Sequence, residues 1–258
     1  MPILTNSDTA KYTLENVYPI SISEADRQYS LKPAVLLNFM QDLAAQSIDR
    51  LGHEYCWDEL YKKGLGWFLI RYRIEFDDYP IKLSSIKIQT ENRGVSRLNA
   101  FRDFEGYDVL SDKRLFRAVS SWFIVDLNDK TVLNISQEYP DFFKFEKRED
   151  DLVLRKIKPL DIPTSEKPFH VRYDDLDING HVNNTVYITW AMEALDYDFR
   201  ITHKLKNLDI YFKHEVKYGE DIISQAKIDT ENKISEHLIK NAQTGEEVCM
   251  LKAEYVNF

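Results

Sequence analysis

Three polar side chains occupy alternate positions in the segment DLDINGHVNN: Asp177, Asn179 and His181. In an extended chain alternate residues point to the same side, so these side chains are predicted to converge. A histidine beside a carboxylate is a common arrangement for general acid–base catalysis. Glu215 is the fourth candidate, because it is predicted on the strand that follows the next helix and that strand can pack against the segment.

The cluster directly precedes a predicted helix. Apolar residues recur at spacings of three and four after Asn184 and form one helix face: Tyr187, Trp190, Ala191, Ala194 and Leu195. Unpaired backbone N–H groups and the helix dipole favour negative charge at such an end. The backbone at Val182, Asn183 and Asn184 is therefore a candidate for holding an oxyanion.

Each of these residues also has a structural interpretation. An aspartate such as Asp177 commonly organises a turn, and Asn179 followed by glycine is a frequent turn pair. A metal ion held by His181, His214 and Glu215 is a further alternative. These three residues do not follow a recognised ligand spacing, so no metal site is predicted.

The chain contains one pattern twice. The segments YPISISEAD and FHVRYDDLD lie 151 positions apart, and a helical pattern follows each, from Pro33 in the first copy. The first copy keeps an aspartate, Asp26, but has Gln28 and Ser30 where the second has asparagine and histidine. A polar cluster present in only one copy is not required by the fold, which favours a functional role.

A second pair of segments, YRIEFDDYPIKLSSIKIQTEN and FKHEVKYGEDIISQAKIDTEN, lies 140 positions apart and shares seven of 21 residues. This alignment places Glu75 opposite Glu215, so a structural role common to both is the main alternative for Glu215. The smaller offset predicts about 11 extra residues after the first helix.

Each copy is thus predicted as a strand, a long helix and several antiparallel strands, which makes the chain an α+β protein. The predicted domains are residues 1–132 and 166–258. A charged segment with three prolines, 133–165, is predicted to link them.

Composition excludes several classes of function. The 258 residues include 43 acidic and 34 basic ones, a net charge of −9, which disfavours nucleic-acid binding. The two cysteines, Cys56 and Cys249, form no disulfide framework. We find no secretory pattern and no apolar run of membrane-spanning length, so a cytoplasmic protein without a membrane span is expected. No G-x-S-x-G or G-x-x-x-x-G-K-[ST] element is present.

The segment DLDINGHVNNTVYITWAMEALD closely resembles the signature of the fatty acyl-ACP thioesterases, D-L-D-x-N-x-H-V-N-N-x-x-Y-x-x-W, and we expect a bacterial member. The resemblance implies two tandem hotdog domains, each an antiparallel sheet wrapped around a long helix. It implies hydrolysis of fatty acyl-acyl carrier protein to free fatty acid, without a cofactor, by Asp177, Asn179, His181 and Glu215. Plant members carry a cysteine after the acid where this chain has Val216, which argues against a cysteine mechanism here.

The resemblance also implies an acyl tunnel in the first domain and docking of acyl carrier protein, a small acidic protein. The tunnel candidates, which could equally be core residues, lie on the first helix: Phe39, Met40, Leu43 and Ala44. The docking candidates are four lysines near the cluster in sequence: Lys204, Lys206, Lys213 and Lys217. Two fused hotdogs fit either a monomer or a homodimer.

Other functions remain open at the level of sequence. A hotdog acyl-CoA thioesterase or a hydroxyacyl-thioester dehydratase would use a similar histidine and carboxylate. A non-enzymatic acyl-binding protein would need the tunnel alone, but four polar residues retained in one copy argue against it.

Overall fold

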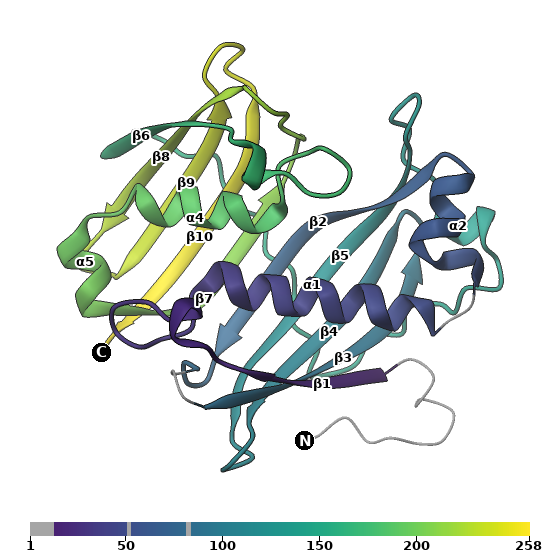
Figure 1. Ribbon diagram of the computed structural model, residues 1–258, viewed down its shortest axis with the longest axis horizontal. Helices are drawn as coiled ribbons and strands as arrows, with labels where there is room; N and C mark the ends of the chain where they lie inside the picture. Colours follow the sequence, from purple (N-terminus) through teal and green to yellow (C-terminus); the bar gives the residue numbers. More distant parts are fainter. Residues whose placement is uncertain (1–12, 51–52, 81–83) are drawn as a thin grey trace.

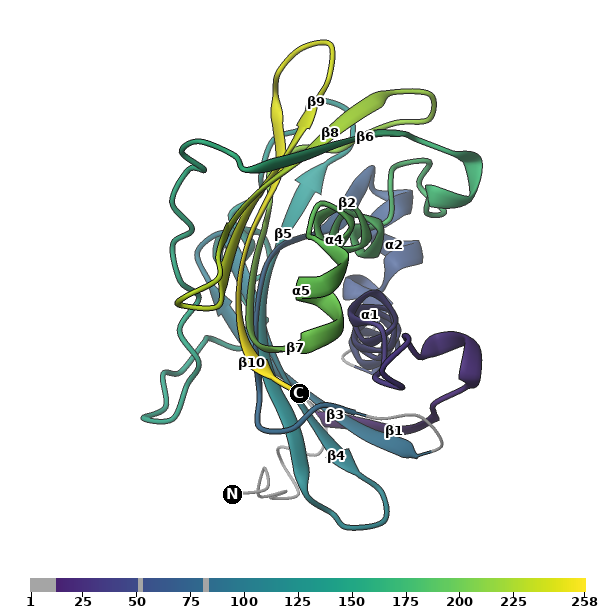
Figure 2. The same cartoon turned by 90° about the vertical axis from the view of Figure 1, so that its left-hand side faces the viewer.

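The computed structural model describes residues 13–50, 53–80 and 84–258. Ten strands within these ranges form one sheet, in the order β1-β3-β4-β5-β2-β7-β10-β9-β8-β6, and each neighbouring pair is antiparallel. The sheet curves, and the two longest helices lie on its concave side (Figures 1 and 2). This is the predicted α+β architecture.

The two halves repeat one order of elements. The first half contains β1 (Thr13–Pro19), α1 (Pro33–Asp49), α2 (Trp57–Lys62), β2 (Leu65–Phe76), β3 (Ser85–Ser96), β4 (Asn99–Asp108), β5 (Arg114–Asp126) and α3 (Ile135–Glu138). The second contains β6 (Ser165–His170), α4 (Asn184–Glu193), α5 (Tyr197–Thr202), β7 (His203–Phe212), β8 (Asp221–Asp229), β9 (Ile234–Asn241) and β10 (Glu247–Asn257). Short 3-10 segments lie at Ile22–Glu24, His53–Tyr55 and Tyr173–Asp175. In both halves a strand precedes the long helix and four strands follow it.

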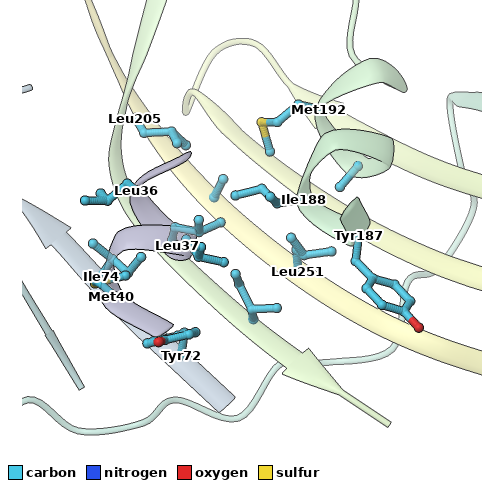
Figure 3. Close-up of a cluster of buried hydrophobic side chains, with 14 of the residues drawn as sticks. Leu36, Leu37, Met40, Tyr72, Ile74, Tyr187, Ile188, Met192, Leu205 and Leu251 are labelled. Atoms are coloured by element: carbon cyan, nitrogen blue, oxygen red, sulfur yellow. The ribbon is translucent and has the colours of Figure 1, made fainter. Parts of the chain in front are cut away.

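The halves join where β2 pairs with β7, in a register centred on Arg73 opposite Asp209. One hydrophobic core continues beneath this seam. Figure 3 shows side chains of both long helices, among them Leu37 of α1 and Ile188 of α4, in one buried cluster above the strands of the seam. The two halves are therefore packed as one body and share buried surface, which stabilises both.

The halves correspond with an offset that differs in part from the predicted one. The backbone N–H of Val182 donates to the carbonyl of Val216 (2.9 Å), and in the first half Leu31 donates in the same way to Pro80 (2.9 Å). Val182 and Leu31 are 151 positions apart, as predicted, but Val216 and Pro80 are 136 apart, not 140. The two T-E-N triplets consequently lie in different elements, one within β3 and the other in the turn after β8.

By this correspondence the counterpart of Glu215 is Tyr79, and its predicted match to Glu75 is wrong. Glu75 lies in β2, where it accepts hydrogen bonds from Arg73 (2.6 Å) and Arg117 (2.8 Å). The error has a physical cause. Side chains on a strand alternate with a period of two, so a shift of four residues leaves each one on the same face of the sheet.

Residues 139–164 contain no helix or strand and pass over the convex side of the sheet (Figure 2). Arg148 binds Glu91 of β3 (2.7 Å), and Arg155 binds Glu254 of β10 (3.3 Å). The connecting segment is therefore fastened to both halves.

His237 in β9 should make the fold sensitive to acid. The side chain is completely buried, its Nε2 lies 2.7 Å from Ser235 Oγ, and burial lowers its pKa to about 4. The unfolded chain binds a proton near pH 6.5, so lowering the pH from about 6.5 to about 4 should cost up to about 3 kcal/mol of stability. Urea denaturation at both pH values should show a smaller loss in His237→Gln than in the exposed control His170→Gln. Equal losses would exclude His237.

Candidate active site

The segment DLDINGHVN forms a tight loop, not the extended stretch that was predicted. Asp177 Oδ1 accepts hydrogen bonds from the backbone N–H groups of Asn179 (2.8 Å) and His181 (3.2 Å). Gly180 has a φ of +76°, a conformation that glycine adopts without strain. The polar side chains thus come together because the chain turns around Asp177, and not because strand residues alternate.

The first half builds the same loop without the histidine. Asp26 Oδ1 accepts hydrogen bonds from the backbone N–H groups of Gln28 (2.9 Å) and Ser30 (2.9 Å). Because these bonds form where the asparagine and histidine are absent, the carboxylate at Asp177 has a structural role in shaping the loop.

Glu215 reaches this loop from the segment after β7, three residues beyond the end of the strand, and not from within a strand. The hydrogen bond from Val182 to Val216 and a bridge between His181 and Lys217 hold that segment beside the loop. His181 Nδ1 lies 3.3 Å from Glu215 Oε1. Their side chains are 21% and 26% exposed, so both are shielded but still open to a substrate.

The two carboxylate oxygens of Glu215 have different surroundings. Oε2 accepts a hydrogen bond from Lys130 Nζ (3.1 Å), a residue of the turn after β5 in the first half. Oε1 is buried and accepts no hydrogen bond from the residues that the structure describes. The oxygen beside His181 can therefore accept a hydrogen bond from water or substrate.

The backbone at the start of α4 offers fewer oxyanion donors than predicted. The N–H of Val182 is bonded to the segment that carries Glu215, and the N–H of Asn183 is bonded to the carbonyl of Asp175 (2.8 Å). Asn183 instead caps the helix with its side chain. Asn184 is the first helical residue, and its N–H makes no hydrogen bond within the described ranges, so it is the candidate that remains.

A cavity of about 1280 Å³ adjoins the loop. The four predicted catalytic residues line it: Asp177, Asn179, His181 and Glu215. The other walls come largely from the first half, including α1, α2, the start of β2 and inward-facing residues of β4 and β5. The polar loop of the second half thus opens into a space bounded by the first.

One of the four predicted acyl-binding residues lines this cavity, namely Ala44. Phe39 stacks on Tyr18 with ring centroids 4.4 Å apart, and Met40 and Leu43 are completely buried in the core. A helix packed between a sheet and a cavity presents apolar residues to both. The apolar character of these residues therefore could not show which of them face the core and which face the cavity.

The geometry does not support the two alternatives to the histidine–glutamate pair, a cysteine nucleophile and a metal site. Val216 is buried, and Cys249 is completely buried in β10, where burial raises the pKa of its thiol. His214 faces Glu246 (3.3 Å) and does not join His181 as the metal alternative requires. Within the described ranges we find no group of three metal-ligating side chains.

Two residues of the site carried no sequence signal. Lys130 lies 85 positions from Glu215, and Gln41 of α1 accepts a hydrogen bond from Asn184 Nδ2 (3.2 Å) across 143 positions. Both come from the first half and reach the site only through tertiary packing, so spacing could not have identified them.

Two family models match the chain. The model of the acyl-ACP thioesterase N-terminal domain matches residues 11–143, and that of the C-terminal domain matches residues 161–257. The chain belongs to the acyl-ACP thioesterase family. Membership agrees with the resemblance found in the segment that contains the catalytic candidates.

Relatives of this thioesterase family member include plant proteins. The chain is 26% identical over 216 residues to oleoyl-acyl carrier protein thioesterase 2, chloroplastic, of Arabidopsis thaliana, covering 77% of this chain and 58% of that protein. It is 26% identical over 213 residues to palmitoyl-acyl carrier protein thioesterase, chloroplastic, of the same plant, covering 78% and 51%. The chain spans about half the length of the curated relatives it matches.

Solved structures of acyl-ACP thioesterases share the fold. The enzyme from Bacteroides thetaiotaomicron matches with a TM-score of 0.82 and 22% identity, covering 96% of this chain and 98% of its own. The 12:0-ACP thioesterase from Umbellularia californica matches with a TM-score of 0.84 and 19% identity, covering 95% and 98%. The predicted tandem hotdog fold is confirmed. Among the described helices, none is long and apolar enough to cross a bilayer.

Proposed function

We propose that this chain hydrolyses the thioester of fatty acyl-acyl carrier protein and releases the free fatty acid. The observation that supports this most is the contact of His181 with Glu215, 3.3 Å apart on the wall of a cavity of about 1280 Å³. A thioester carbonyl beside this pair would leave its alkyl chain in the cavity, against apolar residues such as Leu69 and Trp122.

The His181–Glu215 pair is needed for the attack of water on the thioester carbonyl. Glu215 Oε1 holds the water and, with His181, takes its proton while the water oxygen bonds to the thioester carbonyl carbon. The carbon–sulfur bond then breaks, and the leaving thiolate takes a proton from His181. The products are a fatty acid and a free thiol, so water is the sole co-reactant.

The neighbouring residues would serve this step in different ways. The N–H of Asn184, at the start of α4, is the proposed donor to the oxyanion that forms on the carbonyl. The exposed side chain of Asn179 orients the carbonyl. Asp177 acts as a positioning residue through its hydrogen bonds to the loop backbone.

The proposed partner is acyl carrier protein, which requires a local positive surface on a chain of net charge −9. Of the four predicted lysines, Lys213 and Lys217 lie beside the catalytic loop. Lys204 and Lys206 lie towards the opposite end of β7, where Lys204 contacts Asp78 after β2 and Lys206 donates to the carbonyl of Phe76 at the end of β2. The proposed docking surface is therefore Lys213, Lys217 and Lys130.

Release of thiol from acyl-ACP and from acyl-CoA, followed with a thiol reagent at low and high salt, tests substrate and partner together. We expect free fatty acid from acyl-ACP. We also expect a KM for acyl-ACP that rises with ionic strength more than the KM for acyl-CoA, because salt screens contacts between exposed charges. Equal salt dependence would contradict the docking surface. An enoyl product, or binding without thiol release, would contradict hydrolysis.

A further inference from the structure

The wall of the cavity formed by the first half contains a buried arginine. Arg102 lies on β4 and faces inward like its neighbours Ala100 and Phe104, in a row of alternating buried positions. It is 5% exposed and lines the cavity together with Asn92 of β3, the residue opposite it in the sheet. Such a position in a half-buried strand normally holds an apolar side chain.

Arg102 has no carboxylate partner in the described part of the chain. Its Nη1 donates to Ser47 Oγ (2.9 Å) and Thr90 Oγ1 (3.1 Å), both neutral groups. The other buried arginines differ, since Arg73 and Arg93 each bind two carboxylates. A buried cation without a counter-ion is costly, so the site is incomplete without an acceptor.

The carboxylates next to Arg102 in sequence and in the cavity wall do not supply that acceptor. Asp103 points to the opposite face of the sheet, where it binds Arg93. Asp42 and Asp58 also line the cavity, but both are exposed, and the partners of Arg102 are the hydroxyls of Ser47 and Thr90 instead. The charge of Arg102 therefore remains directed at the cavity.

The groups around Arg102 add further unused donors. Asn92 Oδ1 accepts a hydrogen bond from the N–H of Gly94 (3.1 Å), which leaves the two amide hydrogens of Asn92 for another acceptor. Tyr72 lies in the same row of the sheet, with Ser120 between it and Arg102, and its buried hydroxyl has no partner among the described residues. Hydrogen-bond donors thus outnumber hydrogen-bond acceptors around Arg102.

We propose that Arg102 and Asn92 form a donor pocket that binds an oxygen substituent on the acyl chain, a hydroxyl or oxo group or, most strongly, a carboxylate. A guanidinium offers donors in a fixed geometry and no acceptor, which suits such an oxygen. The proposal rests on the proposed function and names the class of its substrate: oxygenated acyl chains.

The oxygen must lie well along the chain, away from the thioester. Glu215 follows β7, and Arg102 lies on β4, which is separated from β7 by β2 and β5. Three strand spacings amount to about 14 Å across the sheet. A substituent next to the thioester carbonyl would not reach the donor pocket, whereas one in the distal half of a long chain would.

The test compares acyl-ACP substrates of one chain length that carry no substituent, a hydroxyl in the distal half, or a terminal carboxylate. We expect the best oxygenated chain to exceed the unsubstituted chain at least about tenfold in kcat/KM, because a buried donor left unpaired rejects a chain without the acceptor. Arg102→Met should abolish this preference, because it removes both the donors that favour the oxygenated chain and the unpaired charge that disfavours the plain chain. Arg71→Met is the matched control, since Arg71 stacks on Tyr211 (4.4 Å) outside the cavity.

A binding measurement separates this inference from the proposed hydrolysis. The corresponding free acids can be titrated against the fluorescence of Trp122, which lines the cavity. Preferential binding of the oxygenated acid without hydrolysis of any thioester would retain the donor pocket and overturn the proposed function. Equal binding and equal hydrolysis of plain and oxygenated chains by the unmodified protein would overturn the donor pocket, whether or not Arg102→Met folds.

Discussion

Replacing His181 with alanine or Glu215 with glutamine should each lower kcat by at least about a hundredfold. General acid–base help is typically worth about 10²–10⁴-fold, and the two side chains contact each other through Nδ1 and Oε1. Because they act on one proton, the losses should not add, and the double variant should be little worse than the poorer single one. Initial rates of thiol release measure this, after circular dichroism has shown that each variant folds.

The first half supplies matched controls for these variants. Ser30→Ala and Tyr79→Phe alter the residues that correspond to His181 and Glu215, and both should leave kcat within a few-fold. A folded Glu215→Gln variant with near-normal kcat would contradict the proposed pair. The carboxylate role would then pass to Asp177, with His181 as its partner.

Replacing Ala44 with phenylalanine should shift the products towards shorter fatty acids. Ala44 is the residue of the predicted tunnel set that lines the cavity, so a larger side chain there removes space from the chain. Each methylene in an apolar pocket is worth about 1–3 kcal/mol, so the longest chain that the unmodified protein accepts should lose at least about tenfold in kcat/KM. Gas chromatography of the released acids gives the profile.

Met40→Trp is the control for that shift, because Met40 lies on the same helix but is buried in the core. Overpacking a core typically costs about 1–3 kcal/mol. The variant should therefore melt at a lower temperature and keep the product profile. If the profile moved in Met40→Trp and stayed unchanged in a folded Ala44→Phe, the cavity wall would be assigned incorrectly.

The sequence was sufficient to predict those parts of the site that depend on residues close together in the chain. The aspartate in each copy and the helical spacing after it were sufficient to locate the two matching loops and helices. The four residues predicted for catalysis all line one cavity, although the loop turns around Asp177 where an extended segment was expected. The hydrogen bonds that Asp177 accepts from nearby backbone N–H groups leave no trace in the pattern of polar and apolar residues, so the turn could not be predicted from that pattern.

The features that could not be predicted from the sequence depend on tertiary contacts. The match of Glu215 to Tyr79 could not be distinguished from a match to Glu75, since both registers keep the alternation of a strand. Lys130 and Arg102 could not be placed at all. Their roles depend on which strands are neighbours in the sheet, and charged residues on a strand are ordinarily solvent-facing.

The seam between β2 and β7 has a consequence for how this molecule behaves on dilution and how it can evolve. Lys130 and Glu215 come from opposite sides of that seam, yet they belong to one polypeptide. Their encounter is therefore intramolecular, with an effective concentration that does not fall when the protein becomes scarce. In a pair of identical subunits each mutation is present twice, whereas here the two halves mutate independently. One half can therefore carry a histidine, His181, while the other carries a serine, Ser30, at the corresponding position.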